Sequence, residues 1–258
     1  MAALPGTLRY AEREARIWRH LWRGTAFSGT LSPILFLGAI GIGIGGLVEE
    51  NTGTVQGLDY LSFVAPGLLV AFSVQRVAGA SLWQVMAGHK WFGGFHAAVT
   101  TPLRPADVYS GWLTWQVTLA AMNAVPFLAV AAVLGGIRSP WAVFAIPAAA
   151  LTALAFAAVL AAYSCTQDTD RNFAGILRLI ILPLMLFSGT FFPLENLPAG
   201  FRPIAWATPM WHGVELSRGA TTGSIELASA GLHVAFLIAF VVLGAMWGVR
   251  SFTRRLAP

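Results

Sequence analysis

Charged residues are scarce in this sequence: Asp, Glu, Lys and Arg make up 10% of its 258 residues, while hydrophobic residues make up 57%. A soluble domain carries about 25% charged residues, which it needs to cover a surface that faces water. Together with a mean hydropathy of +0.69, this scarcity excludes a soluble globular domain and indicates a membrane protein. We therefore attribute the net charge of +5 to membrane topology and expect no nucleic-acid partner.

Cysteine and lysine occur once each. Because Cys165 stands alone, the sequence excludes an intramolecular disulfide and a metal cage built from cysteines. Lys90 follows a histidine instead of a glycine-rich run, so the chain has no phosphate loop for binding and hydrolysing ATP. The H-E-x-x-H zinc motif is missing as well. We predict no catalytic residue, no metal site and no directly bound cofactor.

Six apolar stretches approach or exceed the length of about 20 helical residues that a hydrocarbon core of about 30 Å requires. They predict an all-α, polytopic membrane protein in which residues 1–258 form a single transmembrane domain. The fifth stretch is the shortest. The stretches cover residues 26–48, 60–83, 108–134, 141–163, 176–192 and 227–249.

Basic residues are unevenly distributed between the segments that join these stretches. With the N-terminus placed in the cytoplasm, most Lys and Arg residues fall on the cytoplasmic side, and the first external loop, residues 49–59, has none. Cytoplasmic loops of membrane proteins carry such an excess of Lys and Arg. The distribution predicts six spans with both termini in the cytoplasm.

Residues 7–23 predict an amphipathic helix that lies in the cytoplasmic interface instead of spanning the membrane. Leu8, Ala15, Trp18 and Trp22 recur at steps of three, four and seven residues, while the arginines of this segment fall on the other side. Such a helix places Trp at headgroup depth and Arg toward anionic lipid. The charged region is too long for a cleavable signal peptide, and no cleavage site follows the first apolar stretch.

Carboxylates are absent from the central part of every predicted span, and Arg76 in the second is the only charge that intrudes. Ion-coupled carriers normally rely on buried carboxylates. Their absence argues against secondary transport, although backbone carbonyls can bind Na⁺ in some carriers. Because the predicted spans are rich in Phe, Leu and Ala, we expect a pathway between them to suit an amphipathic or lipid-like cargo better than an ion.

The cytoplasmic segment over residues 88–107 joins the second and third spans and is unusually aromatic. Four apolar residues at helical spacing predict a short amphipathic helix, which two prolines end before the third span begins. An exposed aromatic helix favours a docking surface for a partner protein, and a helix on the lipid surface is the alternative. The four residues are Trp91, Phe92, Phe95 and Val99, and the prolines are Pro102 and Pro105.

The external segment over residues 191–218 is too apolar for an ordinary loop and too rich in proline for a span. Non-helical backbone at membrane depth must be covered by protein or line a cavity, so we predict short re-entrant helices between the fifth and sixth spans. His212 and Glu215 lie one helical turn apart and are placed to hydrogen-bond. A membrane-embedded enzyme acting on lipid is an alternative function, for which this pair is the only candidate.

Each of these two segments contains a motif with proline. The motifs are Thr101-Pro102-Leu103-Arg104-Pro105 with Asp107 and Gly111, and Ser188-Gly189-Thr190-Phe191-Phe192-Pro193-Leu194 with Pro209, His212 and Arg218. In their order and spacing the sequence resembles the permease subunits of type-2 ABC transporters, within the branch of nodulation-factor, daunorubicin-type drug and polysaccharide exporters. The resemblance covers nearly the whole chain and includes the six spans, the basic amphipathic helix and the short basic tail.

The resemblance implies a permease subunit in a bacterial plasma (inner) membrane, which moves a drug, glycolipid or polysaccharide outward and pairs with a second copy or a close paralogue. Two copies of a cytoplasmic ABC ATPase would bind ATP and Mg²⁺, and this explains the missing phosphate loop. By analogy, residues 90–99 form the coupling helix, the N-terminal helix makes a second ATPase contact, and residues 191–218 form the external gate.

The resemblance also assigns residues to these two sites. The docking region is weakly charged where many relatives carry a Glu, so aromatic contacts are expected to compensate. The implied coupling residues are Lys90, Trp91, Phe92, Phe95, Pro102, Leu103 and Arg104, and the implied gate residues are Phe191, Phe192, Pro193, Trp206, Pro209, Trp211 and His212.

Overall fold

The computed structural model describes residues 5–200 and 202–257, except for the side chains at 25–30, 32–33, 41–42, 44, 48–49 and 51–52. Within this part of the chain the regular elements are all helices, and none is a strand. The predicted all-α fold is confirmed.

Four of the described helices are long and apolar enough to cross a membrane. They coincide with the second, third, fourth and sixth predicted spans. Proline occupies the first turn of two of them, where its missing N–H leaves no hydrogen bond unmade. The four are α3 (Tyr60–Met86) with its π-helical continuation η2 (Ala87–Trp91), α5 (Pro105–Val133), the 3-10 helix η3 (Pro140–Phe144) with α6 (Ala145–Thr166), and α11 (Leu227–Leu256).

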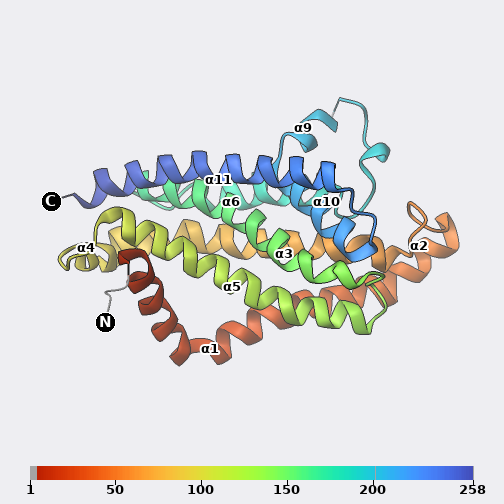
Figure 1. Ribbon diagram of the computed structural model, residues 1–258, viewed down its shortest axis with the longest axis horizontal. Helices are drawn as coiled ribbons and strands as arrows, with labels where there is room; N and C mark the ends of the chain where they lie inside the picture. The colour runs from red at the N-terminus through yellow and green to blue at the C-terminus, as the bar shows by residue number, and fades with distance from the viewer. Residues whose placement is uncertain (1–4, 201, 258) are drawn as a thin grey trace.

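The predicted amphipathic helix and the first predicted span belong to one helical run. α1 (Gly6–Gly38) continues through the π-helical η1 (Ala39–Ile44) into α2 (Gly45–Thr52). The N-terminal part of α1 leans away from the remainder and lies against the start of α5 (Figure 1). Gly111 permits this close approach, because a Cβ there would lie 2.6 Å from the carbonyl oxygen of Thr7.

The fifth predicted span is shorter than expected. Its helical part consists of α7 (Phe173–Ile176), η4 (Leu177–Ile181) and α8 (Leu182–Phe187), so the predicted end at Phe192 is wrong. The helix ends early because Gly189 adopts a left-handed conformation with a φ of 79°, which glycine reaches without steric cost. The resulting turn rests on α3, where a Cβ on Gly67 would lie 2.9 Å from the Cα of Thr190.

Three short helical elements follow this turn: η5 (Leu194–Asn196), α9 (Arg202–Trp206) and α10 (Pro209–Thr222). In Figure 1, α9 stands apart from the bundle, whereas α10 packs against α3, α6 and α11. Gly213 makes the contact with α6 possible, because a Cβ at this position would overlap the side chain of Thr152. The helix ends at Gly223, whose left-handed φ of 79° is typical of a residue that follows a helix.

α6 lies at the centre of the bundle and contacts α3, α5, α10 and α11. Its buried face is lined by alanines, including Ala149, Ala153 and Ala157. Small side chains let helices approach closely in lipid, where van der Waals packing replaces the hydrophobic effect between helices. The Tyr109 hydroxyl adds a hydrogen bond from α5, because it donates to the Ala158 carbonyl oxygen at 2.9 Å.

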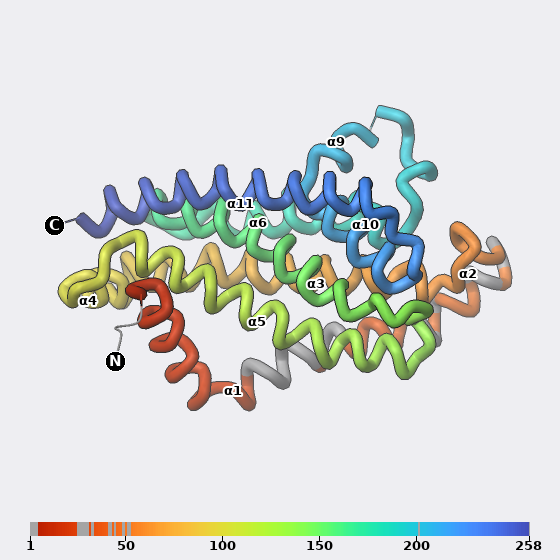
Figure 2. Tube along the Cα trace, in the orientation of Figure 1, coloured from red at the N-terminus to blue at the C-terminus, as the bar shows by residue number. Residues whose placement is uncertain are grey.

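The two segments that the sequence singles out lie at opposite ends of the bundle. The start of α1, α4 (Gly94–Val99) and the end of α11 gather at the left of Figure 1, and α2, α9 and α10 lie at the right. Figure 2 shows the same arrangement along the chain trace. The described ends of the chain therefore lie on the same side of the bundle.

Candidate functional site

An aromatic cluster holds the predicted coupling segment in place. Phe95 of α4 is only 4% exposed, and its ring centroid lies 6.3 Å from that of Tyr10 and 5.5 Å from that of Phe252. Gly88 leaves room for this ring, because a Cβ there would lie 2.5 Å from a Phe95 ring atom. Phe95 therefore anchors the segment to α1 and α11 and does not face solvent.

The amphipathic helix predicted over residues 91–99 is divided in the structure. η2 ends at Trp91, and Gly93 adopts a φ of 66° before α4 begins at Gly94. A left-handed residue interrupts a right-handed helix, so Trp91 and Phe92 do not share a helical face with Phe95. Phe92 is 84% exposed and Trp91 is 49% exposed. These two side chains form what we call the aromatic tip.

Lys90 belongs to an ion network that the sequence does not predict. Its Nζ lies 3.7 Å from Oδ1 of Asp168, and Nη2 of Arg255 lies 2.5 Å from the same oxygen. The hydrogen bond from Arg255, helped by the charges of Arg255 and Lys90, holds the pKa of Asp168 below its usual range. Exposed ion pairs contribute little stability. Because Lys90 directly precedes Trp91, we expect the network to orient the aromatic tip instead.

A groove of about 550 Å³ borders the remaining predicted coupling residues. Arg104 precedes α5, and its backbone N–H donates to Oδ2 of Asp107 at 3.0 Å, which satisfies one of the free donors at the helix start. Pro102 is exposed in the turn before it. The groove lies between α4, the start of α5 and the end of α11, and its lining includes Val99, Leu103, Arg104, Leu256 and Ala257.

At the opposite end of the bundle, Arg218 clamps the external segment to α3. Its guanidinium donates to the carbonyl oxygen of Gly189 at 2.5 Å and to that of Phe63 at 3.3 Å. It also lies 4.0 Å from the Phe63 ring centroid and donates to Oε1 of Glu215 at 2.9 Å. Arg218 is 7% exposed, and a buried charge of this kind requires such partners. We call these contacts the Arg218 clamp.

The expected hydrogen bond between His212 and Glu215 is wrong, because Glu215 pairs with Arg218. His212 instead lies with its Nε2 3.0 Å from the Trp206 carbonyl oxygen and its Nδ1 2.7 Å from Nδ1 of His233. A carbonyl oxygen only accepts, so Nε2 of a neutral His212 carries the proton and its Nδ1 accepts from His233. The His212 ring also stacks on Phe236 with a centroid distance of 3.9 Å.

Acidification is expected to destabilise this histidine pair. Burial, followed by the neighbouring His233, lowers the pKa of His212 to about 4, whereas an exposed His titrates near 6.5. Between these two pKa values the unfolded chain binds a proton that the folded chain does not. The free energy of unfolding therefore decreases by up to about 1.4 kcal/mol for each unit by which the pH is lowered. Thermal unfolding at pH 7 and pH 4.5 measures the effect, and His212→Phe should show the smaller decrease. Equal decreases would contradict the assignment.

The other predicted gate residues surround a small apolar cluster. Phe192 and Trp211 pack against this cluster, which consists of Leu194, Leu197 and Ala205. The ring of Trp206 lies 6.4 Å from that of Trp211. Tyr60 of α3 donates its hydroxyl to the Phe191 carbonyl oxygen at 3.4 Å, while Pro193 and Pro209 stand at the starts of η5 and α10.

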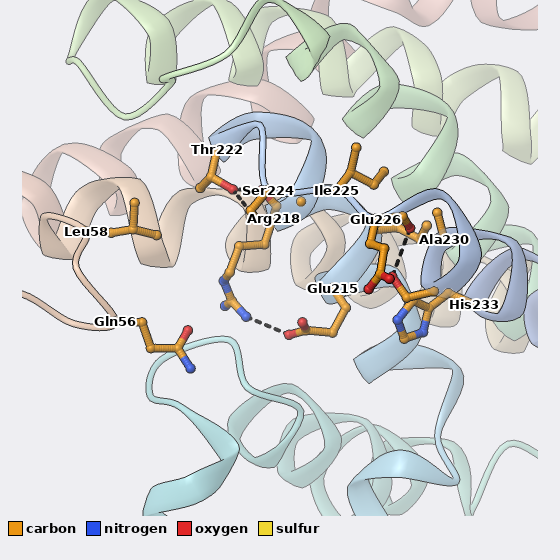
Figure 3. Close-up of a pocket in the computed structure, with 13 residues that line it drawn as sticks. Gln56, Leu58, Glu215, Arg218, Thr222, Ser224, Ile225, Glu226, Ala230 and His233 are labelled. Carbon is orange, nitrogen blue, oxygen red and sulfur yellow. Dashed lines mark hydrogen bonds and ion pairs between the residues drawn. The ribbon is translucent and has the colours of Figure 1, made fainter.

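A polar pocket of about 290 Å³ opens beside the Arg218 clamp. In Figure 3, Glu215 and Arg218 extend from α10 toward Gln56 on the loop that precedes α3, and Glu226 and His233 line the pocket from the side of α11. Among the residues that the structure describes, no group of three or more His, Cys, Asp or Glu side chains is placed to hold a metal ion. The pocket offers hydrogen-bonding groups at the end of the bundle where the gate was predicted.

These features define a helical membrane protein whose two ends differ. One end carries the exposed aromatic tip, and the other carries the clamped, proline-rich segment. The family model for ABC-2 type transporters matches residues 11–222, and the chain belongs to this family. The resemblance inferred from the two motifs is thereby confirmed.

Curated relatives match along almost the whole chain. Nodulation protein J of Rhizobium meliloti (strain 1021) is 26% identical over 94% of this chain and 93% of its own length. Nodulation protein J of Bradyrhizobium diazoefficiens is 28% identical over 93% of this chain and 92% of its own. The capsule polysaccharide export inner-membrane protein BexB of Haemophilus influenzae is 26% identical over 78% of this chain and 74% of its own.

Proposed function

We propose that the chain is the permease subunit of an ATP-driven exporter that moves an amphipathic or lipid-linked substrate out of the cytoplasm or the inner leaflet. Family membership supports transport, and a relative named for capsule polysaccharide export supports a glycan or glycolipid among the candidate cargoes. One observation carries the proposal: the aromatic tip and the clamped external segment lie at opposite ends of one bundle. A motor therefore has access to one end while cargo leaves at the other.

The aromatic tip supports docking of a cytoplasmic ABC ATPase. Exposed aromatic side chains are typical anchors of protein interfaces, and Phe92 is 84% exposed at the end of the bundle that also carries the groove lined by Leu103 and Arg104. We assign the contact to Trp91 and Phe92, and we assign Phe95 to positioning them. Two ATPase copies would bind ATP and Mg²⁺, since the chain has no phosphate loop.

The short length of the fifth helical segment supports a dimer of permease subunits. Leu179, Ile180 and Leu182 are exposed there, on a segment shorter than the four spans of full length. A second copy, or a close paralogue, would cover this face and complete a pathway between the two subunits.

We infer six spans, with the α1–α2 run and the α7–α8 segment added to the four long helices. In this topology, residues 191–218 re-enter the outer leaflet as the gate and both termini lie in the cytoplasm of a bacterial cell. The grouping of α4 with both described chain ends supports this orientation.

Cysteine labelling in cells is expected to reveal this orientation. The native Cys165 is buried, so it should react slowly and provide a low background. Ser224→Cys, in the loop before α11, should react with a membrane-impermeant maleimide in intact cells, whereas Thr253→Cys should react only after permeabilisation; both positions are exposed. The reverse pattern would indicate the inverted topology. Labelling of both cysteines in intact cells would contradict the six-span arrangement.

Affinity purification from native membranes, followed by reconstitution, tests the function. An ABC ATPase should co-purify, and vesicles containing both proteins should move an amphipathic cargo only when ATP is supplied. Lipid modification by the purified chain alone would instead support the enzyme alternative. Transport abolished by an uncoupler while ATP is maintained would support an ion-coupled carrier.

A further inference from the structure

The residues that α3 exposes are polar, whereas a helix that faces lipid exposes apolar residues. Every residue of α3 is described, and the only two that are exposed are Gln75 and Gln84. α11, by contrast, exposes leucine, isoleucine, valine and methionine side chains, as expected for contact with hydrocarbon. Amide groups facing lipid tails would lose their hydrogen bonds. Nine residues turn an α-helix through about 180°, so the two amides lie on opposite sides of α3, and we expect each of them to face a polar space instead of lipid tails.

Arg76 follows Gln75 and lies near the middle of the continuous helix formed by α3 and η2. At 1.5 Å per residue it is roughly 24 Å along α3 from Tyr60 and roughly 15 Å from Met86. Its guanidinium donates to Oε1 of Gln116 at 3.4 Å and to the Gln116 carbonyl oxygen at 3.1 Å. Its Nε is buried and has no hydrogen-bond partner. The side chain is thus held against α5 with one donor unused.

Among the described side chains, no carboxylate pairs with this arginine. None of the ion pairs between described residues includes Arg76. The sequence has no acidic residue from 15 to 48, from 60 to 106 or from 108 to 167, so the central parts of α1, α3, α5 and α6 cannot supply one. A charge inside the membrane is costly without a counter-charge and marks a functional site by default.

A cavity of about 390 Å³ leads toward this charge from the end that carries the aromatic tip. Trp18 of the amphipathic part of α1 and Trp115 of α5 stand in its wall, with their ring centroids 5.9 Å apart. Gln84 and Gln116 also line it. Because Gln116 Nε2 donates to Gln84 Oε1 at 3.1 Å, a continuous series of polar groups runs from the cavity to the guanidinium of Arg76.

We propose that Arg76 binds the phosphate group of a membrane lipid or lipid-linked cargo that enters beneath the amphipathic part of α1. The guanidinium presents a planar set of donors that matches a phosphate, and the side-chain amide of Gln84 adds donors from the cavity wall. The tail of the ligand would stay in the apolar, tryptophan-lined part of the cavity. The inference rests on the proposed export function, for which it names the chemical class of the cargo.

Lipid binding by the purified full-length chain tests the proposal. The chain is titrated in neutral detergent with phosphatidic acid, with phosphatidylcholine as reference, and bound lipid is counted by native mass spectrometry. We expect Arg76→Gln to weaken phosphatidic acid binding by about tenfold to hundredfold, the range for a lost hydrogen bond to a charged group. Arg76→Lys should retain part of the preference, because it keeps the charge and loses the planar set of donors. The control Arg250→Gln, exposed near the end of α11, should bind like the wild type.

Two further measurements separate a binding role from a structural one. If Arg76 serves a ligand, Arg76→Gln should unfold at the same temperature as the empty wild type or higher, because a buried unpaired charge is removed. A lower unfolding temperature with unchanged lipid binding would show that the residue only joins α3 to α5. Displacement of phosphatidic acid by an equal concentration of inorganic phosphate would also overturn the proposal, because the site would then select free anions.

The ATPase is absent from this experiment, so its outcome is independent of the motor. Failure of ATP-driven transport with intact phosphatidic acid binding would overturn the export function alone. If the wild type and Arg76→Gln transported cargo equally and bound lipid equally, the proposed phosphate site would be wrong. The proposed export function would be unaffected.

Discussion

Replacing Arg218 with methionine is expected to unfold the external end of the bundle and to lower the free energy of unfolding by about 2 to 3 kcal/mol, the cost of leaving buried carbonyl oxygens without this donor. Methionine fills much of the same volume but donates no hydrogen bond. The carbonyl oxygens of Gly189 and Phe63 would lose their donor, and Glu215 would lose its counter-charge. Thermal unfolding in lipid nanodiscs measures the stability, and limited proteolysis of residues 188–208 locates the opening.

Two variants make this prediction specific. Arg218→Lys keeps a charge near Glu215 but cannot reach both carbonyl oxygens and the carboxylate together, so an intermediate loss is expected. Arg171→Met removes an exposed arginine and should change stability by no more than about 0.5 kcal/mol. If Arg218→Met were as stable as Arg171→Met, the clamp would not hold the external segment.

The long helices could be predicted from sequence because lipid imposes a simple condition on them. A span needs enough apolar residues in a row, and this condition identified α3, α5, α6 and α11. It carries no information about neighbours, because side chains that face lipid and side chains that face another helix are both apolar. In the sequence, the alanines are the only sign that α6 lies at the centre of the bundle. They do not show which helices pack against them.

Local backbone geometry explains most of what the sequence did not predict. Helical spacing placed Phe92 and Phe95 on one face, which holds only while the helix is continuous, and Gly93 interrupts it. Gly189 ends the fifth helix for the same reason. In both places a glycine in the sequence was the available signal. Because glycine is tolerated in either conformation, only tertiary packing decides which one it adopts.

Arg218 could have been recognised by its position. It is one of the few basic residues on the side predicted to be external, in a segment that is mostly apolar. A charge in such a place needs partners, and the nearest acidic residue, Glu215, is three positions away. The contacts with Gly189 and Phe63 join residues far apart in the chain, so no local pattern could reveal them.

One helix connects the features of both ends. α3 and η2 run without interruption from Tyr60 to Trp91. Phe63 near the start of α3 contacts the Arg218 clamp, and Gly67 contacts the turn at Thr190. The aromatic tip begins at Trp91, where η2 ends. We therefore expect a displacement of the tip by a motor to reach the external segment along this helix, past Arg76.

Phe92→Asp and Phe95→Asp are expected to fail in different ways, although the two residues are three positions apart. Phe92 is exposed, so its replacement should leave the unfolding temperature nearly unchanged and reduce both ATPase stimulation and transport at least about tenfold, because interface anchors carry most of the binding energy. Phe95 is buried against Tyr10 and Phe252. A carboxylate there should cost about 3 kcal/mol or more in stability, since it removes a packed ring and buries a charge.

The comparison of these variants decides what the coupling segment does. Unfolding temperature, ATPase binding and transport are measured for both, with Phe95→Leu as a variant that preserves much of the packing and should keep its activity. A stable Phe92→Asp that binds the ATPase and transports normally would remove the tip from the interface, and the groove beside Leu103 would then be the remaining docking surface. Loss of coupling in a fully stable Phe95→Asp would mean that the cluster opens to admit the motor, so that Phe95 contacts it directly.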